Sequence, residues 1–136
     1  MNSSFGAASA LRRVAGAARQ RALVVIVSDF RGPRDWRRPL LRLAGRHEVL
    51  AVEVRDPREQ TLEPVGTLWL VDPESGRELQ VDTNSSGLRE RFAAAAAAER
   101  RDVAREFSAA GVAHVTLSTD RDWLRDLAIF FRRRRA

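Results

Sequence analysis

The sequence contains no cysteine, so disulfides and thiolate metal sites are excluded. The two histidines, His47 and His114, are too few for a histidine-based zinc site without carboxylate ligands. No stretch approaches the roughly 18 consecutive apolar residues that a membrane-spanning helix requires. We therefore expect a cytoplasmic chain without a membrane span and without a tightly bound cofactor.

The motifs of common enzymes are also missing. There is no P-loop, no dinucleotide-binding glycine motif, no nucleophile elbow and no H-E-x-x-H zinc motif. Ser28 and Asp29 are adjacent, but nothing around them marks a nucleophile with its base. We expect a protein that is not an enzyme; a hydrolase is the alternative, and no motif supports it.

Lysine is absent too, so all 24 basic residues are arginine and the formal charge is +6. A basic balance is typical of proteins that bind nucleic acid or an anionic surface. Most arginines alternate with acidic residues, as in "RDPRE" and "RERF", which is typical of a solvated surface. The terminal "FFRRRRA" has the same two interpretations, with a favourable helix-dipole interaction as a further structural one. We favour the solvated surface and keep binding to nucleic acid or an anionic surface as the alternative.

What is present fits one α/β domain. The 136 residues are 44% hydrophobic and 31% charged, the balance of a globular protein. Apolar periodicity and turn residues predict helix 4–20, strand 22–28, helix 35–45, strand 48–54, hairpin 67–82, helix 87–110, strand 113–118 and a last helix after Thr119. This order predicts a Rossmann-like open parallel sheet flanked by helices, with an inserted antiparallel hairpin.

Local patterns add detail to the predicted strands and helix starts. Strand 22–28 is apolar on both faces, which predicts helical cover on both sides. Asp35 is a candidate cap of the second helix, and Gly45 should end it. Thr119 and Asp122 form a capping-box pattern before the last helix.

Two helices are expected to present apolar stripes to the core. Leu124, Leu127 and Phe131 form the expected inward face of the last helix. The corresponding stripe of helix 87–110 is Leu88, Phe92, Ala96, Val103 and Phe107.

Polar residues follow all three sheet strands, where ligands of open α/β sheets bind. They are Ser28, Asp29, Asp56, Ser118, Thr119 and Asp120. Their oxygen atoms suit Mg²⁺ better than a soft metal. Each has a structural alternative: Asp29 shapes a turn, Asp56 precedes a proline and Thr119 caps a helix.

Four motifs follow one another along the chain: "LVVIVSDF", "PLLRLAGRHEVLAVEVRDPRE", the hairpin with "VDPESG" and "VDT", and "TDRDWLRDLAIFFRRRR". This ordered series resembles the DUF58 family, bacterial proteins with a von Willebrand factor A-like domain. The resemblance covers nearly the whole chain, 1–136, with the hairpin at about 67–82 as an insertion.

The resemblance implies a metal-ion-dependent adhesion site built from three loops. Asp29 in "VSDF" matches the aspartate that follows a central strand, with Ser28 beside it. The start of the first helix has Ser3, Ser4 and Phe5 where the family has a threonine, and the D-x-S-x-S loop with its strand is not found. We therefore expect the carboxyl-terminal part of such a domain, with a weak remnant metal site, Asp56, Thr119 and Asp120 at its edge, and firm Mg²⁺ binding only in an intact domain.

The resemblance also implies a function. Family members commonly carry an amino-terminal membrane anchor, sit beside MoxR-type AAA+ ATPases and are thought to act in assembly or chaperone-like roles. We expect a non-enzymatic interaction module with a protein partner, such as a MoxR-type ATPase. Self-association through strand 22–28 is also expected, because no proline or charge between Ala22 and Val27 guards that strand's edge.

Overall fold

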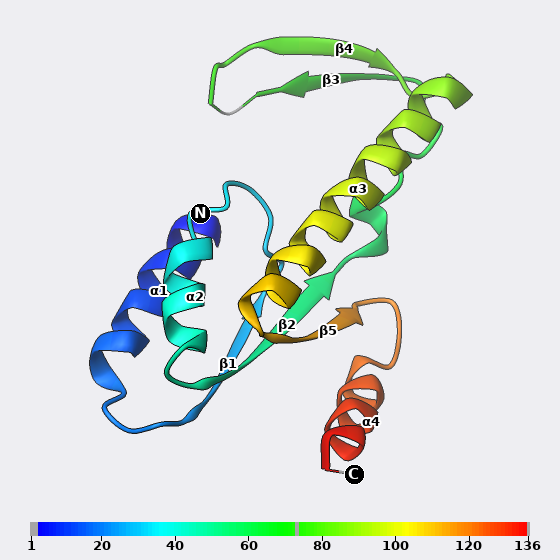
Figure 1. Ribbon diagram of the computed structural model, residues 1–136. Coiled ribbons are helices and arrows are strands. Elements are labelled where there is room, and N and C mark those ends of the chain that lie inside the picture. The colour runs from blue at the N-terminus through cyan, green and yellow to red at the C-terminus, as the bar shows by residue number, and fades with distance from the viewer. Residues whose placement is uncertain (1–2, 73, 136) are drawn as a thin grey trace. The chain divides into compact units, whose positions relative to one another are not determined.

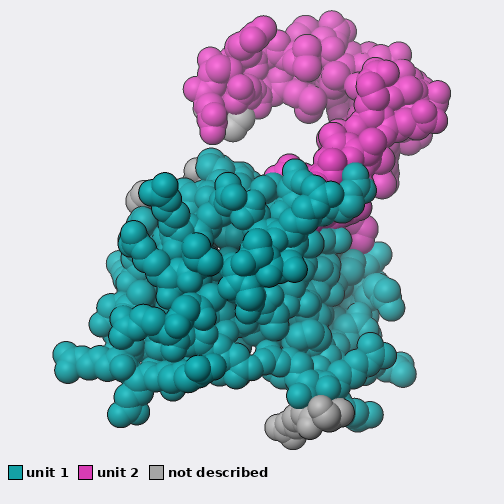
Figure 2. Space-filling view, in the orientation of Figure 1, with its two compact units in different colours: residues 1–56, 101–136 teal, residues 57–100 magenta. Residues whose placement is uncertain are grey.

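The computed structural model describes residues 3–72 and 74–135, and their contacts divide the chain into two compact units. Residues 1–56 and 101–136 form the first unit and residues 57–100 the second (Figure 2). The first unit holds a three-stranded parallel sheet, and the second holds an antiparallel hairpin. None of the described helices is long and apolar enough to cross a membrane.

The sheet of the first unit has the strand order β1-β2-β5 (Figure 1). These strands are β1 (Leu23–Ser28), β2 (Glu48–Arg55) and β5 (Ala113–Ser118). The register pairs Val25 with Leu50, and Leu50 with Ala113. This confirms the predicted strands and their parallel direction. Their carboxyl ends therefore share one edge of the sheet.

Helices cover one face of this sheet and form the larger core with it. They are α1 (Ser3–Ala17), α2 (Arg37–Ala44) and the C-terminal part of α3 (Ser86–Ala110). Trp36 and Phe107 are fully buried in this core. The ring of Phe30 lies 5.4 Å from that of Trp36 and 4.8 Å from that of Phe107, in edge-on contacts that aromatic pairs prefer.

The opposite face of the sheet has a smaller core under α4 (Trp123–Arg135). Leu50, Val52 and Leu117 are buried there, and Leu127 and Phe130 of α4 pack against them.

This smaller core does not reach the outer strand. Leu23, Val25 and Val27 of β1 point to the same face and are exposed, Val27 by 65%. The prediction that β1 is covered on both faces was wrong. An apolar run allows a strand to be buried, but here the helix on that face lies over β5 and β2.

The two helix starts differ from their predicted caps. α2 begins at Arg37 with Trp36 at its N-cap position and no side-chain capping bond, so the prediction for Asp35 was wrong. Gly45 ends α2 as predicted. Thus α2 relies on the burial of Trp36, and its first turn has no polar cap.

The start of α4 is capped by a different residue from the one predicted. Asp122 Oδ1 accepts the N–H of Arg125 at 3.1 Å, which satisfies a free donor of the first turn. The N–H of Thr119 instead donates to the carbonyl oxygen of Arg55 at 2.8 Å. Thr119 therefore continues the link between β5 and β2, and Asp122 alone caps the helix.

The predicted apolar stripes are buried only in part. In α3, Val103 and Phe107 are buried, whereas Phe92 is 39% exposed. In α4, Leu124 is 63% exposed and Phe131 36% exposed. Periodicity identified the apolar positions, but burial follows only where a helix lies over a core.

The second unit contains η1 (Pro57–Glu59), β3 (Thr67–Val71) and β4 (Glu78–Asp82), and the last two form the predicted hairpin. Asp72 organises its turn, because its carboxylate accepts the N–H of Glu74 at 2.9 Å and the hydroxyl of Ser75 at 2.8 Å. Gly76 follows with φ +71°, a conformation that favours glycine.

Thr83 fixes the base of the hairpin. It is fully buried, and its hydroxyl donates to the carbonyl of Gly66 and accepts the N–H of Val65. Its own N–H also donates to the Gly66 carbonyl at 2.9 Å. A single side chain therefore joins the two ends of the hairpin.

Phe107→Ala should destabilise the protein by about 3–5 kcal/mol, because it removes a fully buried ring and leaves a cavity. Urea unfolding followed by circular dichroism measures this loss. Phe92→Ala is the control, since it removes the same ring from a half-exposed position of the same helix. Equal losses for the two variants would contradict the described core.

Candidate functional site

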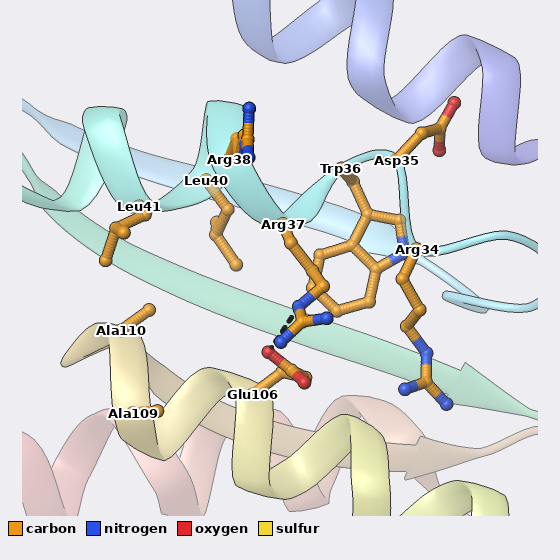
Figure 3. A pocket seen from close by; sticks show the side chains of 10 residues that line it. All are labelled: Arg34, Asp35, Trp36, Arg37, Arg38, Leu40, Leu41, Glu106, Ala109 and Ala110. Carbon is orange, nitrogen blue, oxygen red and sulfur yellow. Dashed lines mark ion pairs between the residues drawn. The ribbon is translucent and has the colours of Figure 1, made fainter.

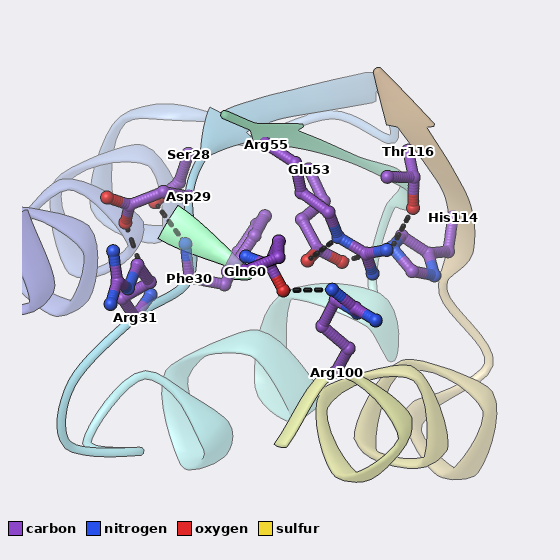
Figure 4. Close-up of polar contacts among 10 residues, drawn as sticks. All are labelled: Ser28, Asp29, Phe30, Arg31, Glu53, Arg55, Gln60, Arg100, His114 and Thr116. Atoms are coloured by element: carbon purple, nitrogen blue, oxygen red, sulfur yellow. Dashed lines mark hydrogen bonds and ion pairs between the residues drawn. The ribbon is translucent and has the colours of Figure 1, made fainter. Parts of the chain in front are cut away.

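The polar pair at the end of β1 shapes a tight turn. Ser28 Oγ accepts the N–H of Phe30 at 3.1 Å, and Asp29 Oδ1 accepts the N–H of Arg31 at 3.2 Å (Figure 4). Phe30 has φ +51°, a left-handed conformation that is uncommon for a bulky residue. The two bonds hold this conformation and direct the Phe30 ring into the core.

The polar residues after β5 are held by local contacts and by β2. Ser118 Oγ donates to Asp120 Oδ1, and Thr119 is tied to the main chain of β2. The register places Ser118 beside Arg55, and Ser28 beside Glu53. The sheet therefore brings the ends of the three strands to one edge, as the sequence predicted.

This edge does not offer Mg²⁺ a set of carboxylates. Within residues 3–72 and 74–135, no three His, Asp or Glu side chains gather where a metal ion could be held. The hydroxyl of Ser28 and one oxygen of Asp29 already accept backbone N–H groups. Mg²⁺ needs carboxylates or phosphates to displace its waters. The described residues alone therefore do not fit the metal site that the family resemblance implies.

A buried polar cluster lies just inside the same edge. Glu53 of β2 is 4% exposed, and its carboxylate accepts Arg55 Nε at 2.9 Å. Its other oxygen lies 2.9 Å from Nε2 of His114 on β5 (Figure 4). The His114 ring also packs 4.7 Å from that of Phe107. The cluster thus joins two strands and contacts the larger core.

The balance of forces on Glu53 favours its charged form. Burial raises the pKa of the Glu53 carboxyl. The hydrogen bonds from His114 and Arg55, together with the Arg55 charge, lower this pKa by more than burial raises it. The net pKa lies below the ordinary value of 4.5. Glu53 is therefore a charged residue at neutral pH with both oxygens engaged.

The geometry of this cluster does not form a proton relay. Thr116 Oγ1 lies 3.4 Å from His114 Nε2, the same nitrogen that contacts Glu53. In a catalytic triad the nucleophile and the carboxylate bond to opposite nitrogens of the imidazole. His114 therefore cannot pass a proton through its ring between Thr116 and Glu53.

Alternation along strand 48–54 places Glu53 on the same face as Val49 and Ala51, but the sequence analysis did not identify this cluster. A glutamate at an inward position of an apolar strand was the available signal. A buried carboxylate needs a partner, and the sequence did not show that His114 would supply it.

An apolar groove lies on the α4 side of the sheet. It has a volume of about 320 Å³ and is lined by Val25, Val27, Val52, Val54, Leu117, Ser118, Thr119, Trp123, Leu127 and Phe131. Trp123 is 50% exposed at this groove. The groove adjoins β1, whose described pairing is with β2 alone. Apolar surface and an open strand edge therefore lie next to each other.

A second cavity, of about 630 Å³, lies beside the start of α2 (Figure 3). Its lining includes Arg37, which forms an ion pair with Glu106 at 2.8 Å, and also Arg38 and Asp35. Among the residues that the structure describes, the buried Nε1 of Trp36 finds no hydrogen-bond partner. Three arginines and two carboxylates line this cavity, so its charges nearly balance and favour neither an anionic nor a cationic ligand strongly.

The comparisons with known proteins identify a family. The family described as "Protein of unknown function DUF58" matches residues 3–102. The chain belongs to the DUF58 family.

Several mycobacterial proteins are similar to this DUF58 chain. The uncharacterized protein MAV169 of Mycobacterium avium is 50% identical over 119 residues, which are 86% of this chain and 69% of the relative. The uncharacterized protein Rv1480 of Mycobacterium tuberculosis is 51% identical over 119 residues, 86% of this chain but 37% of the relative. The uncharacterized protein Mb1516 of Mycobacterium bovis shows the same values. No solved structure matches this chain.

Glu53→Gln should destabilise the protein by about 1.5–3 kcal/mol at pH 7, because it removes two charge-assisted hydrogen bonds. A carboxyl group whose pKa is lower in the folded state stabilises the fold at any pH above its unfolded-state pKa. This stabilisation is lost as the pH falls through the folded-state pKa. The difference between the variant and the parent should therefore shrink below about pH 4.5. Urea unfolding across this range measures the trend. Glu48→Gln, at an exposed position, is the control. A loss of stability in Glu53→Gln that is equal at every pH would contradict the lowered pKa of Glu53.

Mg²⁺ should bind this chain no more tightly than the millimolar range, because no three His, Asp or Glu side chains of the described residues gather where they could hold a metal ion. Isothermal titration calorimetry with MgCl₂ tests this expectation. Micromolar binding that disappears in Asp29→Ala would show that other residues complete the site.

Proposed function

We propose that this DUF58 chain is a non-enzymatic protein-interaction module that binds its partner through β1 and the apolar groove beside it. The observation that carries the proposal is the coincidence of an open strand edge with exposed apolar side chains. The expected partner segment is an extended strand that pairs with β1 and carries apolar side chains over the groove.

The edge of β1 supplies the backbone part of this surface. On the side away from β2, no strand of residues 3–72 and 74–135 pairs with β1. An open edge presents unpaired N–H and C=O groups that attract another strand. Charged and proline residues usually protect such edges, and residues 22–27 contain neither.

The face of β1 supplies the apolar part. Val25 is 45% exposed and Val27 65% exposed, and both line the groove with Trp123. Contiguous apolar surface of this kind is rare on stable monomers and is typical of interaction sites. An added strand would therefore gain both main-chain hydrogen bonds and apolar burial.

The family resemblance extends the proposal to a von Willebrand factor A-like domain. The matched region spans 37% of the Mycobacterium tuberculosis relative, so longer family members hold further chain that is available to contact β1. The adhesion site is proposed to be incomplete here, with Asp29 and Ser28 as its remnant. The proposed partner is a MoxR-type AAA+ ATPase in an assembly or chaperone-like system.

The cluster around Glu53 supports a structural role for the polar edge. Both oxygens of Glu53 are used in hydrogen bonds, and His114 cannot relay a proton between Thr116 and Glu53. Described side chains near the edge thus stabilise turns and strand pairing. This supports an interaction module in preference to a hydrolase.

Val25→Lys with Val27→Lys should reduce self-association of the chain at tens of micromolar and weaken binding to a co-encoded MoxR-type ATPase by about tenfold or more. Lysine on the open strand places charge where the partner strand must dock. Light scattering measures self-association, and biolayer interferometry with the purified ATPase measures binding. Leu41→Lys is the control, because Leu41 is 56% exposed on α2 and outside the groove.

Two results would contradict the proposal. One is a stable monomer that does not bind the ATPase. The other is tight binding of a DNA duplex that collapses as salt is added, with a slope set by phosphate contacts. The second result would favour the arginine-rich alternative, for which the exposed Arg132 and Arg133 of α4 are the best candidates.

A further inference from the structure

The hairpin segment has the opposite charge to the rest of the chain. Residues 57–86 contain two arginines and six carboxylates, a formal charge of −4, whereas the whole chain carries +6. The other residues therefore carry +10. Such separation of charge on one chain favours association between unlike surfaces.

The β3–β4 hairpin combines this negative charge with exposed apolar side chains. Trp69 and Val71 lie on the same face of β3, and their side chains are 65% and 61% exposed. Glu78 is the cross-strand partner of Val71, and Gln80 is that of Trp69. One hairpin face is thus apolar and aromatic along β3, with carboxylate and amide side chains along β4.

An uncovered hairpin of this kind gains from a partner. Two strands alone are at best marginally stable in water. In this hairpin the described bonds stabilise the turn, through Asp72, and the base, through Thr83. The strands between these two points have exposed side chains, including Leu70 and Leu79 on the other face. A docked surface would bury the exposed side chains of these two paired strands.

The C-terminal half of α4 has the complementary chemistry. Phe131 is 36% exposed, and Arg132 and Arg133 follow it as exposed residues. A guanidinium stacks well on an indole face and pairs with carboxylates. These three side chains therefore match the aromatic and acidic residues of the hairpin face.

We propose that the hairpin of one copy docks on the C-terminal half of α4 of a second copy. The predicted contacts place Arg132 or Arg133 on Trp69 and beside Glu78, with Phe131 against Val71. Each copy carries both surfaces, and two copies that exchange both contacts about a two-fold axis form a closed dimer. This interface shares Phe131 with the lining of the apolar groove beside β1, but Arg132, Arg133 and the hairpin lie outside that lining.

The test is an exchange of charge between the two surfaces. A hairpin variant carries Glu74→Arg and Glu78→Arg; it keeps Asp72, which organises the turn, and Asp82, which accepts the N–H of Asn84. A helix variant carries Arg132→Glu and Arg133→Glu. Sedimentation velocity on each variant should show dimerisation weakened by about tenfold or more at low salt.

Mixing the two variants in equal amounts should restore the dimer. In the mixed pair each reversed hairpin meets a reversed helix, and each unchanged hairpin meets an unchanged helix. The chain that carries all four substitutions should also dimerise. Arg12→Glu with Arg13→Glu, on exposed positions of α1, changes the charge equally and should leave dimerisation intact.

Three results would overturn the inference. The first is a dimer that neither charge variant weakens, and the second is an equal mixture of the two variants that stays monomeric. The third is association that returns only in the chain with all four substitutions and does not increase with protein concentration. Circular dichroism of every variant shows whether its helix content is retained. A dimer lost in Val25→Lys with Val27→Lys but kept in both charge variants would leave the β1 proposal standing and this one wrong.

Discussion

The structure depends on the burial of β2, which has a strand on each side and side chains in both cores. Val49 and Ala51 enter the larger core, while Leu50 and Val52 enter the smaller one. A parallel sheet with helices on both faces requires such a strand at its centre. The neighbours of β2 are less well covered, because three strands leave two edges and the described helices are few. The exposed surfaces of the first unit follow from this constraint.

Sequence reasoning predicted the elements better than their surroundings. Apolar runs and turn residues identified the three parallel strands and the hairpin, since these signals are local. Whether Val27 is buried depends on a helix far along the chain, and periodicity does not contain that information. The cap of α4 is a similar case: Thr119 and Asp122 are both good caps, and strand pairing with Arg55 decided between them.

The candidate site shows the same division. The parallel direction of the strands could be inferred from the βαβ pattern, and with it the gathering of polar residues at one edge. The Glu53–His114 contact could not be inferred from the sequence, because the two residues are 61 positions apart and only their side chains meet. The pair Ser28–Asp29 was recognised, but its observed bonds serve the left-handed turn at Phe30. The hydrogen bonds within this turn therefore account for the carboxylate of Asp29 without a metal ion.

Because few helices pack on the strands, apolar side chains stay exposed and are available for binding. Exposed aromatic side chains lie on the hairpin, at Trp69, and on α4, at Trp123 and Phe131. Large aromatic side chains contribute more to association than other exposed residues, because they bury much area with little loss of rotamer freedom. Their neighbours are acidic on the hairpin and basic on α4, so electrostatics favours contact between unlike surfaces and opposes contact between like ones. Apolar area thus supplies the driving force for association, and the separation of charge selects which surfaces meet.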